Sequence, residues 1–269
     1  MAERRRWTPP PVLRASAALH AAAAAGVAVV PAVWPWALAA LVGNHALLGA
    51  IGLWPRSSLL GPNLRRLPAE NARLGQVGLC FDDGPDPAVT PAVLDQLDRA
   101  KAKASFFCIA ERAARHPGLI EAIVRRGHTV ENHSWHHSHR FAAMGVAAIR
   151  REVGEAQRIL TALAGRSPRF FKPPAGLRNP LLDPVLAGLG LHLATWTRRG
   201  YDAVRRDPLA VERRLSRGLA AGDLLMLHDG SAARDGDGRP VVLTVLPRLL
   251  DTLAVRGLRA VSLEVVADD

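Results

Sequence analysis

Short apolar runs alternate with longer amphipathic stretches from residue 76 to the end of the chain, and this pattern restricts the possible folds more than any other feature. The short runs have the length of buried strands, and the longer ones have the spacing of helices. Strands that alternate with helices form a parallel sheet, either closed or open. We expect strands at residues 77–81, 104–109, 129–132, 169–172, 192–195, 224–227 and 260–263, and helices at 90–100, 116–126, 147–164, 181–189, 209–220 and 243–256.

Seven strand-helix units in about 190 residues fit a small, distorted (β/α)7 barrel better than an open dinucleotide-binding sheet. A Gly-x-Gly-x-x-Gly pattern after the first strand would have favoured the dinucleotide fold, and that position lacks it. We therefore predict an α/β catalytic domain over residues 76–269.

Polar side chains gather at the carboxyl ends of the predicted strands. They are Asp82 and Asp83 at the first strand, His133 and His137 after the third, Lys172 at the fourth, Trp196 after the fifth and His228 at the sixth. In a (β/α) barrel these strand ends converge on one face, where active sites are found. The predicted strands alone thus indicate one catalytic face.

A metal site is predicted within this set. His133 and His137 are four residues apart, so on a helical turn both imidazoles would point the same way. With one carboxylate they form a ligand set that leaves positions open for water and substrate. The adjacent carboxylates of Asp82 and Asp83 repel each other unless a cation or a shared proton is present. We interpret the neighbouring His136 as a surface residue.

Five motifs in order resemble the NodB-type polysaccharide deacetylases, carbohydrate esterase family four. Residues 81–85 (Phe-Asp-Asp-Gly-Pro) and 133–137 (His-Ser-Trp-His-His) resemble the first two motifs of that family. Residues 172–176, 196–202 and 225–229 are similar to its Arg-x-Pro, Trp/Asp and apolar-His motifs. The resemblance covers residues 76–263 and implies a distorted (β/α)7 barrel of the NodB-homology type.

The resemblance also implies roles for individual residues. Asp83, His133 and His137 would hold a divalent metal, zinc in the first place, with cobalt, manganese or nickel as alternatives. Asp82 would be the general base and His228 the general acid. These assignments make chemical sense, because a base and an acid with different pKa values are needed on opposite sides of the reacting carbon.

Further roles concern the surroundings of the acid and the base. Lys172 stands where the family has an arginine paired with the catalytic carboxylate, so the charge is kept but the two-pronged guanidinium is lost. Asp202 is the candidate to tune His228. We expect Pro174, Ala175, Trp196 and Arg199 to bind the substrate. The N–H of Ala175 would bind the oxyanion, and the aromatic side chain that the family usually has at this position is absent.

Two alternatives stay open at this stage. Trp196 is interpreted as the floor of an acyl pocket or as a core residue. Arg198 and Arg199 lie where an acidic residue is expected in the family, and they are interpreted as surface charge or as readers of a phosphate on the substrate.

Residues 15–55 contain no Asp, Glu, Lys or Arg. As a helix this stretch would be twice as long as the ~30 Å hydrocarbon core of a bilayer. Pro31 and the Trp34-Pro35-Trp36 cluster mark its middle, so we predict two transmembrane helices at residues 15–30 and 37–54. A cleaved signal peptide is the alternative.

Arginines flank the predicted hairpin on both sides, which favours a cytoplasmic domain. They are Arg4, Arg5, Arg6 and Arg14 before it and Arg56, Arg65 and Arg66 after it. His20, Asn44 and His45 within the apolar stretch are interpreted as hydrogen-bonding partners between the two helices. We expect a membrane anchor at residues 1–56, a linker at 57–75 and the catalytic domain at 76–269, in a bacterial-type inner membrane. A periplasmic domain is the alternative.

The formal net charge of +11 suggests an anionic partner. In the absence of nucleic-acid motifs we expect a membrane with anionic lipid or a phosphate, and no nucleic acid. Cys80 and Cys108 form no zinc-type pair and are interpreted as reduced core residues, which favours a reducing compartment.

The predicted function is therefore metal-dependent hydrolysis of an N-acyl (acetyl or formyl) group on an amino sugar, in a lipid-linked or envelope glycan. Two alternatives remain. One is deacetylation of exported peptidoglycan or poly-N-acetylglucosamine. The other is a catalytically silent sugar-binding module on the same fold, which would have no need of a matched acid and base.

Overall fold

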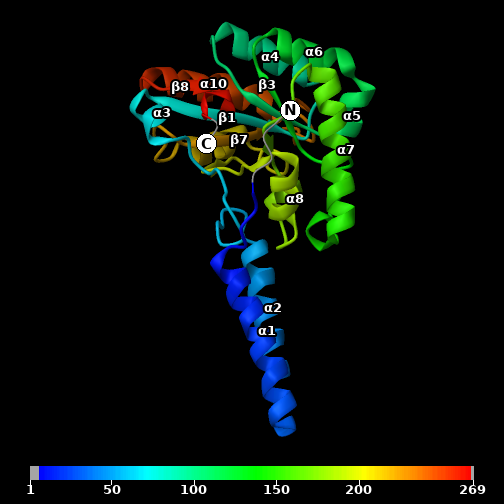
Figure 1. Ribbon diagram of the computed structural model, residues 1–269. Helices are drawn as coiled ribbons and strands as arrows, with labels where there is room; N and C mark the ends of the chain where they lie inside the picture. The colour runs from blue at the N-terminus through cyan, green and yellow to red at the C-terminus, as the bar shows by residue number, and fades with distance from the viewer. Residues whose placement is uncertain (1–5, 268–269) are drawn as a thin grey trace.

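The computed structural model describes residues 6–267, so Arg4 and Arg5 lie outside the described residues. The chain forms a curled parallel sheet with helices around it and a helical hairpin that extends to one side (Figure 1). The strands are β1 (Gln76–Asp82), β2 (Ser105–Cys108), β3 (Thr129–Asn132), β4 (Phe170–Phe171), β5 (His192–Leu193), β6 (Arg198–Arg199), β7 (Leu224–His228) and β8 (Arg259–Val261). The helices of this part are α3 (Ala69–Arg73), α4 (Thr90–Arg99), α5 (Ala110–Arg115), α6 (Pro117–Arg125), α7 (Val146–Ala164), α8 (Leu182–Leu189), α9 (Pro208–Ser216) and α10 (Val241–Val255).

The strand order is β5-β4-β3-β2-β1-β7-β6, with β8 paired to the start of β1. All these pairs are parallel, but β5 and β6 at the two ends do not pair with each other. The predicted distorted (β/α)7 barrel is thus confirmed as a curled sheet that stays open on one side. The sequence did not predict α3, α5 or β6.

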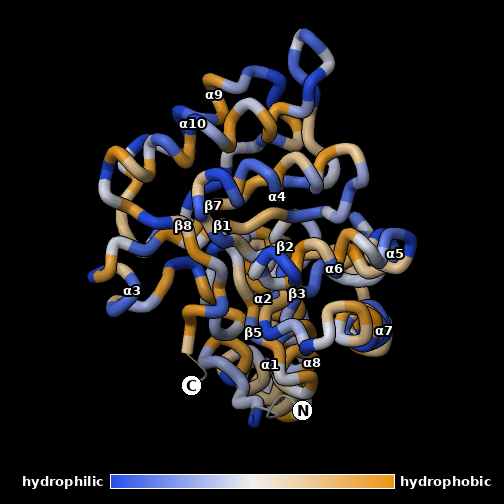
Figure 2. The backbone as a smooth tube through the Cα atoms, turned by 90° about the horizontal axis from the view of Figure 1, so that it is seen from above, coloured by the Kyte–Doolittle hydropathy of each residue, from blue (hydrophilic) through white to orange (hydrophobic). Residues whose placement is uncertain are grey.

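The central strands are buried on both faces, as expected for a parallel sheet between helices. Alternate side chains of β1 belong to different core clusters: Leu79 and Phe81 to the larger one, and Cys80 to another with Phe107. In Figure 2 the strands form a largely apolar centre with helices on either side. This packing holds the polar strand ends in fixed positions.

The two cysteines are free and buried, in agreement with their interpretation as core residues. Burial raises the pKa of the Cys80 thiol to about 12. Cys80 is in register with Ser105, whereas Cys108 lies three residues further along β2 and packs in another cluster. The two thiols therefore lie too far apart to form a disulfide, and they do not indicate the compartment as the sequence suggested.

The segment predicted as a linker, residues 57–75, packs along the open side of the sheet. Leu64 forms a parallel bridge with Ala194 just after β5, and Arg66 bridges Asp223 just before β7. Leu60 and Leu67 are buried. The segment thus contacts the sheet near both of its ends.

The hairpin consists of α1 (Pro11–Val29), the 3₁₀ turn Pro31–Val33 and α2 (Trp34–Gly52). Both helices are long and apolar enough to cross a membrane, a test that signal sequences and core helices also pass. Only 6% and 17% of their apolar windows are buried, so they are not core helices of the domain. Apolar side chains such as Val29 and Trp36 are exposed on the hairpin. The hairpin therefore has an apolar surface that water solvates poorly.

Polar side chains join the two helices of the hairpin, as predicted. Asn44 donates to the Ser16 hydroxyl at 2.8 Å, and the Nε2 atoms of His20 and His45 lie 3.3 Å apart. These bonds satisfy polar groups inside an apolar hairpin, where such contacts favour helix association.

The base of the hairpin is fixed to the domain. The Arg178 N–H donates to the carbonyl oxygen of Gly52 at 3.1 Å. A Cβ at Gly52 would lie 2.2 Å from the Arg178 carbonyl oxygen, so this close approach of two backbones requires glycine. Trp7 donates to the Asp183 carboxylate at 2.9 Å. The hairpin therefore has a defined orientation relative to the sheet.

Candidate active site

One carboxylate and two imidazoles converge where β1 and β3 end. The Nε2 atoms of His133 and His137 lie 3.2 and 3.1 Å from Oδ1 of Asp83. Each residue offers one ligand atom, and the three atoms lie within 4.8 Å of one another. The structure thus brings together the three residues that were predicted as metal ligands.

The loop after β3 directs both imidazoles to this point without a helical turn. The Nδ1 atom of His133 lies 2.7 Å from the carbonyl oxygen of Lys172, so Nδ1–H donates and Nε2 keeps its lone pair. Ser134 and His137 have positive φ angles of 66° and 55°, and the His137 N–H donates to the Ser134 hydroxyl at 3.0 Å. The predicted helical turn was therefore wrong. His136 points to Glu152, as expected of a surface residue.

The charges at this point suit a divalent cation. Burial alone would raise the pKa of Asp83, but the adjacent imidazoles of His133 and His137 outweigh burial and hold this pKa well below its usual range. Burial, together with repulsion from His133, lowers the pKa of His137 to about 4. At neutral pH Asp83 is therefore an anion and His137 a neutral imidazole, the protonation states that a metal requires.

Asp83 Oδ1 is buried and has no hydrogen-bond partner in the described part of the chain. An unsatisfied carboxylate oxygen costs free energy unless a cation or a proton donor occupies the space before it. The donor set of one carboxylate and two imidazoles also matches that of catalytic zinc sites. The residues present therefore fit a divalent metal.

Asp82 lies beside this site and pairs with a buried lysine. The Nζ atom of Lys172 donates to Asp82 Oδ1 at 2.7 Å, and both side chains are less than 5% exposed. The same ammonium lies 4.0 Å from the centre of the Phe107 ring. Lysine therefore replaces the two-pronged contact of an arginine with one hydrogen bond and a cation–π contact.

His228 ends β7 and is held by a second carboxylate. Its backbone N–H and its Nδ1 atom lie 2.7 and 2.9 Å from the two oxygens of Asp202. Burial by itself would lower the pKa of His228, but the charge and hydrogen bond of Asp202 outweigh it and raise the pKa to about 9. Asp82 and Asp83 act in the same direction. The imidazole is therefore protonated at neutral pH and can act as an acid.

Comparison with known proteins agrees with this geometry. Residues 70–194 match the model of the polysaccharide deacetylase family. A chitooligosaccharide deacetylase from Sinorhizobium fredii is 34% identical over 207 residues, which cover 72% of this chain and 93% of that protein. The chain belongs to the polysaccharide deacetylase family. The resemblance seen in the sequence is thereby confirmed.

Two further members of the family show how far the likeness extends. A peptidoglycan-N-acetylglucosamine deacetylase from Bacillus cereus is 28% identical over 188 residues, or 69% of this chain and 85% of that one. The structure of a family 4 carbohydrate esterase from Streptomyces lividans, solved with acetate, superposes with a TM-score of 0.62 at 33% identity. It covers 69% of this chain and 91% of that chain.

In this polysaccharide deacetylase the loop after β4, where the sequence predicts substrate binding, has a left-handed backbone at Ala175. Ala175 is exposed, has a φ of 55° and lies between the buried Pro174 and Gly176. Among the described residues its N–H finds no backbone acceptor. Trp196 is 7% exposed and packs so closely on Gly176 that a Cβ there would lie 2.5 Å from the indole. Trp196 therefore supports the loop, and the Arg199 guanidinium lies 5.1 Å from the centre of the indole.

Two residues that support this site, Asp229 and Arg112, had no predicted role. Asp229 accepts a hydrogen bond from Thr90 at 2.6 Å, and burial raises its pKa to about 7. Arg112, on the unpredicted α5, donates to the Asp83 carbonyl oxygen at 2.7 Å. A Cβ at Gly84 would lie 2.2 Å from the Asp229 carboxylate, so only glycine fits there. The position of Asp229 directly after His228 was the one available signal.

Proposed function

We propose that this protein hydrolyses the N-acyl group of an amino sugar of the N-acetylglucosamine type and releases a carboxylic acid and a free amine. The observation that carries the proposal is the grouping of a metal-ligand set, a carboxylate and a protonated histidine at one edge of the sheet. Asp83, His133 and His137 supply the ligand set, Asp82 the carboxylate and His228 the protonated histidine. The family's activity on amino-sugar glycans supports it.

Asp83, His133 and His137 would hold the metal, which when bound lowers the pKa of a water molecule and polarises the acyl carbonyl. Asp82 accepts the proton of the attacking water, and its ion pair with Lys172 keeps its carboxylate in place. The N–H of Ala175 donates to the carbonyl oxygen as negative charge develops on it. Pro174, Trp196 and Arg199 shape the surface that holds the sugar.

His228 acts as the general acid on the side of the reacting carbon opposite to Asp82. With Nδ1–H directed at Asp202, its Nε2–H donates a proton to the nitrogen of the leaving amine as the C–N bond breaks. Asp82 therefore accepts a proton and His228 donates one. Their different partners support these roles, since Asp82 pairs with the Lys172 ammonium and His228 with the Asp202 carboxylate.

The test is acid release by the full-length protein, purified in detergent and loaded with zinc. Acetate release from an N-acetylglucosamine oligomer, and its loss after chelation of the metal, is the expected result. Sugar binding without acetate or formate release, in protein that holds zinc, would contradict the proposal and identify a silent sugar-binding module.

The pH profile tests the role of His228. Because the acid must be protonated and its pKa lies near 9, kcat/KM should fall as the pH rises through this region. With metal bound the fall is expected at somewhat lower pH, because a nearby dication repels the imidazolium. In Asp202→Asn the charge that raises this pKa is lost, so the alkaline limb should move down by about one to three pH units. A pH–rate profile with an unmoved limb would contradict the assignment.

We also propose that α1 and α2 anchor the protein in a membrane with the catalytic domain on the cytoplasmic side. The exposed apolar surfaces of the two helices support the membrane anchor. The arginines on both flanks support the cytoplasmic orientation of the domain. Alkaline phosphatase fused after residue 269 should therefore be inactive, and a β-galactosidase fusion at the same place should be active. The reverse pattern would place the domain outside, where exported peptidoglycan or poly-N-acetylglucosamine becomes the substrate.

A further inference from the structure

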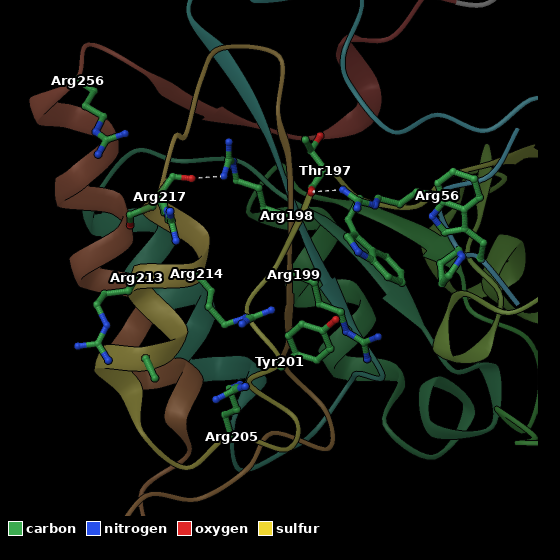
Figure 3. Close-up of a pocket in the computed structure, with 15 residues that line it drawn as sticks. Arg56, Thr197, Arg198, Arg199, Tyr201, Arg205, Arg213, Arg214, Arg217 and Arg256 are labelled. Carbon is green, nitrogen blue, oxygen red and sulfur yellow. Dashed lines mark hydrogen bonds between the residues drawn. The ribbon is translucent and has the colours of Figure 1, made fainter.

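A strongly basic cleft lies where the hairpin joins the catalytic domain. Its volume is about 1060 Å³, and among residues 6–267 eight arginines and no acidic residue line it. Trp54 and Pro55, at the end of the hairpin, form one side, and residues of α9 and of the chain after β6 form the other. We call it the arginine cleft; Figure 3 shows Arg199, Arg205 and Arg214 near Tyr201.

Some of these arginines have structural partners. Arg198 binds the Asp223 carboxylate and two carbonyl oxygens, and Arg213 lies 4.0 Å from Asp207. Arg56 and Arg256 donate to carbonyl oxygens. The remaining four, Arg199, Arg205, Arg214 and Arg217, have no acidic partner within residues 6–267. Arginine stays charged at all physiological pH values, so the cleft keeps a net positive charge that an anion would offset.

Aromatic rings hold two of the unpaired guanidinium groups in place. Arg199 lies 5.1 Å from the centre of the Trp196 ring and 4.9 Å from that of Tyr201, and Arg214 lies 4.8 Å from the Tyr201 ring. A ring that covers the face of a guanidinium leaves its N–H edge free for two parallel hydrogen bonds to a phosphate. The Nε atom of Arg199 is buried and has no hydrogen-bond partner in the described chain. The cleft therefore contains preoriented donors without an acceptor.

The arginine cleft adjoins the active site. Tyr201 directly precedes Asp202, which holds His228. Trp196 and Pro55 both pack on Gly176, next to Ala175. A ligand whose anionic group lies in the cleft could thus extend its sugar toward the catalytic residues.

The position of the cleft also suggests where its ligand comes from. Trp54 and Pro55 of its lining follow the end of α2 directly. At this end of α2 the apolar hairpin meets the domain (Figure 1). With the hairpin in a bilayer, this level is that of the lipid phosphates. Indole and guanidinium groups, which favour this interface, line the cleft here.

We propose that the arginine cleft binds the phosphate or diphosphate that links the amino sugar of the substrate to a membrane lipid. This proposal rests on the proposed function, because it places the scissile acyl group next to a bound phosphate. It identifies the substrate as a lipid-linked, phosphate-bearing amino sugar.

The first test measures binding of inorganic diphosphate by titration calorimetry. Full-length protein is kept in nanodiscs of phosphatidylcholine and stripped of metal, so that diphosphate cannot bind to a metal. The double variant Arg205→Gln/Arg214→Gln should bind diphosphate about a hundredfold more weakly, since each charge-assisted contact contributes about tenfold. The control Arg125→Gln/Arg158→Gln makes the same charge change on α6 and α7 and should stay within about twofold.

The second test compares two soluble sugars in the metal-loaded protein. A nucleoside diphosphate N-acetylglucosamine should be deacetylated with a kcat/KM at least about tenfold above that of the neutral N-acetylglucosamine dimer. The cleft variant should lose this preference, and the control variant should keep it. Diphosphate binding is also measured in nanodiscs that contain phosphatidylglycerol, an anionic lipid. If this lipid abolishes diphosphate binding, the cleft binds the headgroups of bulk lipid, and the assignment of a lipid-linked substrate is overturned.

The outcomes separate this proposal from the proposed function. Turnover of the neutral dimer without diphosphate binding would overturn the arginine cleft as a phosphate site and leave the deacetylase function intact. Diphosphate binding that the cleft variant loses, without turnover of either sugar, would overturn the deacetylase function and with it the lipid-linked substrate.

Discussion

The His133→Gln variant is expected to lose its metal and at least about a thousandfold in kcat/KM. His133 is one of three ligand atoms within 4.8 Å of one another, and the Lys172 carbonyl fixes its Nε2 toward Asp83. Loss of Lewis-acid catalysis costs several kcal/mol, and each ~1.4 kcal/mol is a factor of ten. The zinc content of purified protein and acetate release measure the two effects separately.

His136 provides the matched control for this variant. It lies three residues away, is exposed and binds Glu152 rather than Asp83. His136→Gln should therefore keep its metal and its kcat/KM within about twofold. The assignment of the ligands would be overturned if His136→Gln lost the metal and His133→Gln retained it.

Periodicity and apolar runs were enough to predict most of the fold. The run at residues 129–132 became β3 without change, because a strand buried on both faces needs a continuous buried run. β6 was missed because it consists of Arg198 and Arg199, which have no strand-like pattern. Pairing with Leu225 and Met226 of β7 makes these two residues a strand, and this pairing is not visible locally.

The metal-ligand set was predicted on partly wrong grounds. The sequence interval suggested that a helical turn brings His133 and His137 together, whereas a loop with positive φ at Ser134 and His137 does so. Non-glycine residues seldom adopt such angles, so no sequence rule would have predicted them. The family motif indicated the pair that the structure brings together with Asp83, and the hydrogen bonds to Lys172 and Ser134 give the physical reason.

The arginine cleft was only partly foreseeable. Arg198 and Arg199 stood out because they replace an expected acidic residue, and two interpretations remained open. Both residues line the cleft, but Arg198 binds the Asp223 carboxylate, whereas Arg199 has no acidic partner among residues 6–267 and lies between two aromatic rings. The cleft forms from segments that are far apart in the sequence, including Trp54 and Arg256, so only the fold could bring them together.

The Asp82→Asn variant should keep its metal, and its turnover should be about 10²–10⁴-fold slower, which is the usual contribution of a general base. Asp82 does not belong to the ligand set, so zinc content should stay that of the unmodified protein. The variant also leaves the Lys172 ammonium buried without its partner, since the two side chains lie 2.7 Å apart and are almost fully buried. An uncompensated buried charge costs about 3–5 kcal/mol, so Asp82→Asn is expected to be less stable as well as less active.

A second substitution separates these two effects. In Asp82→Asn/Lys172→Met both members of the buried pair are neutral, and replacing a whole ion pair by groups of similar volume is often neutral or stabilising. The double variant should therefore regain most of the lost free energy of unfolding in a denaturant titration, while its acetate release stays as low as that of Asp82→Asn. Recovery of turnover together with stability would show that Asp82 acts through the fold, and the general base would have to be sought elsewhere.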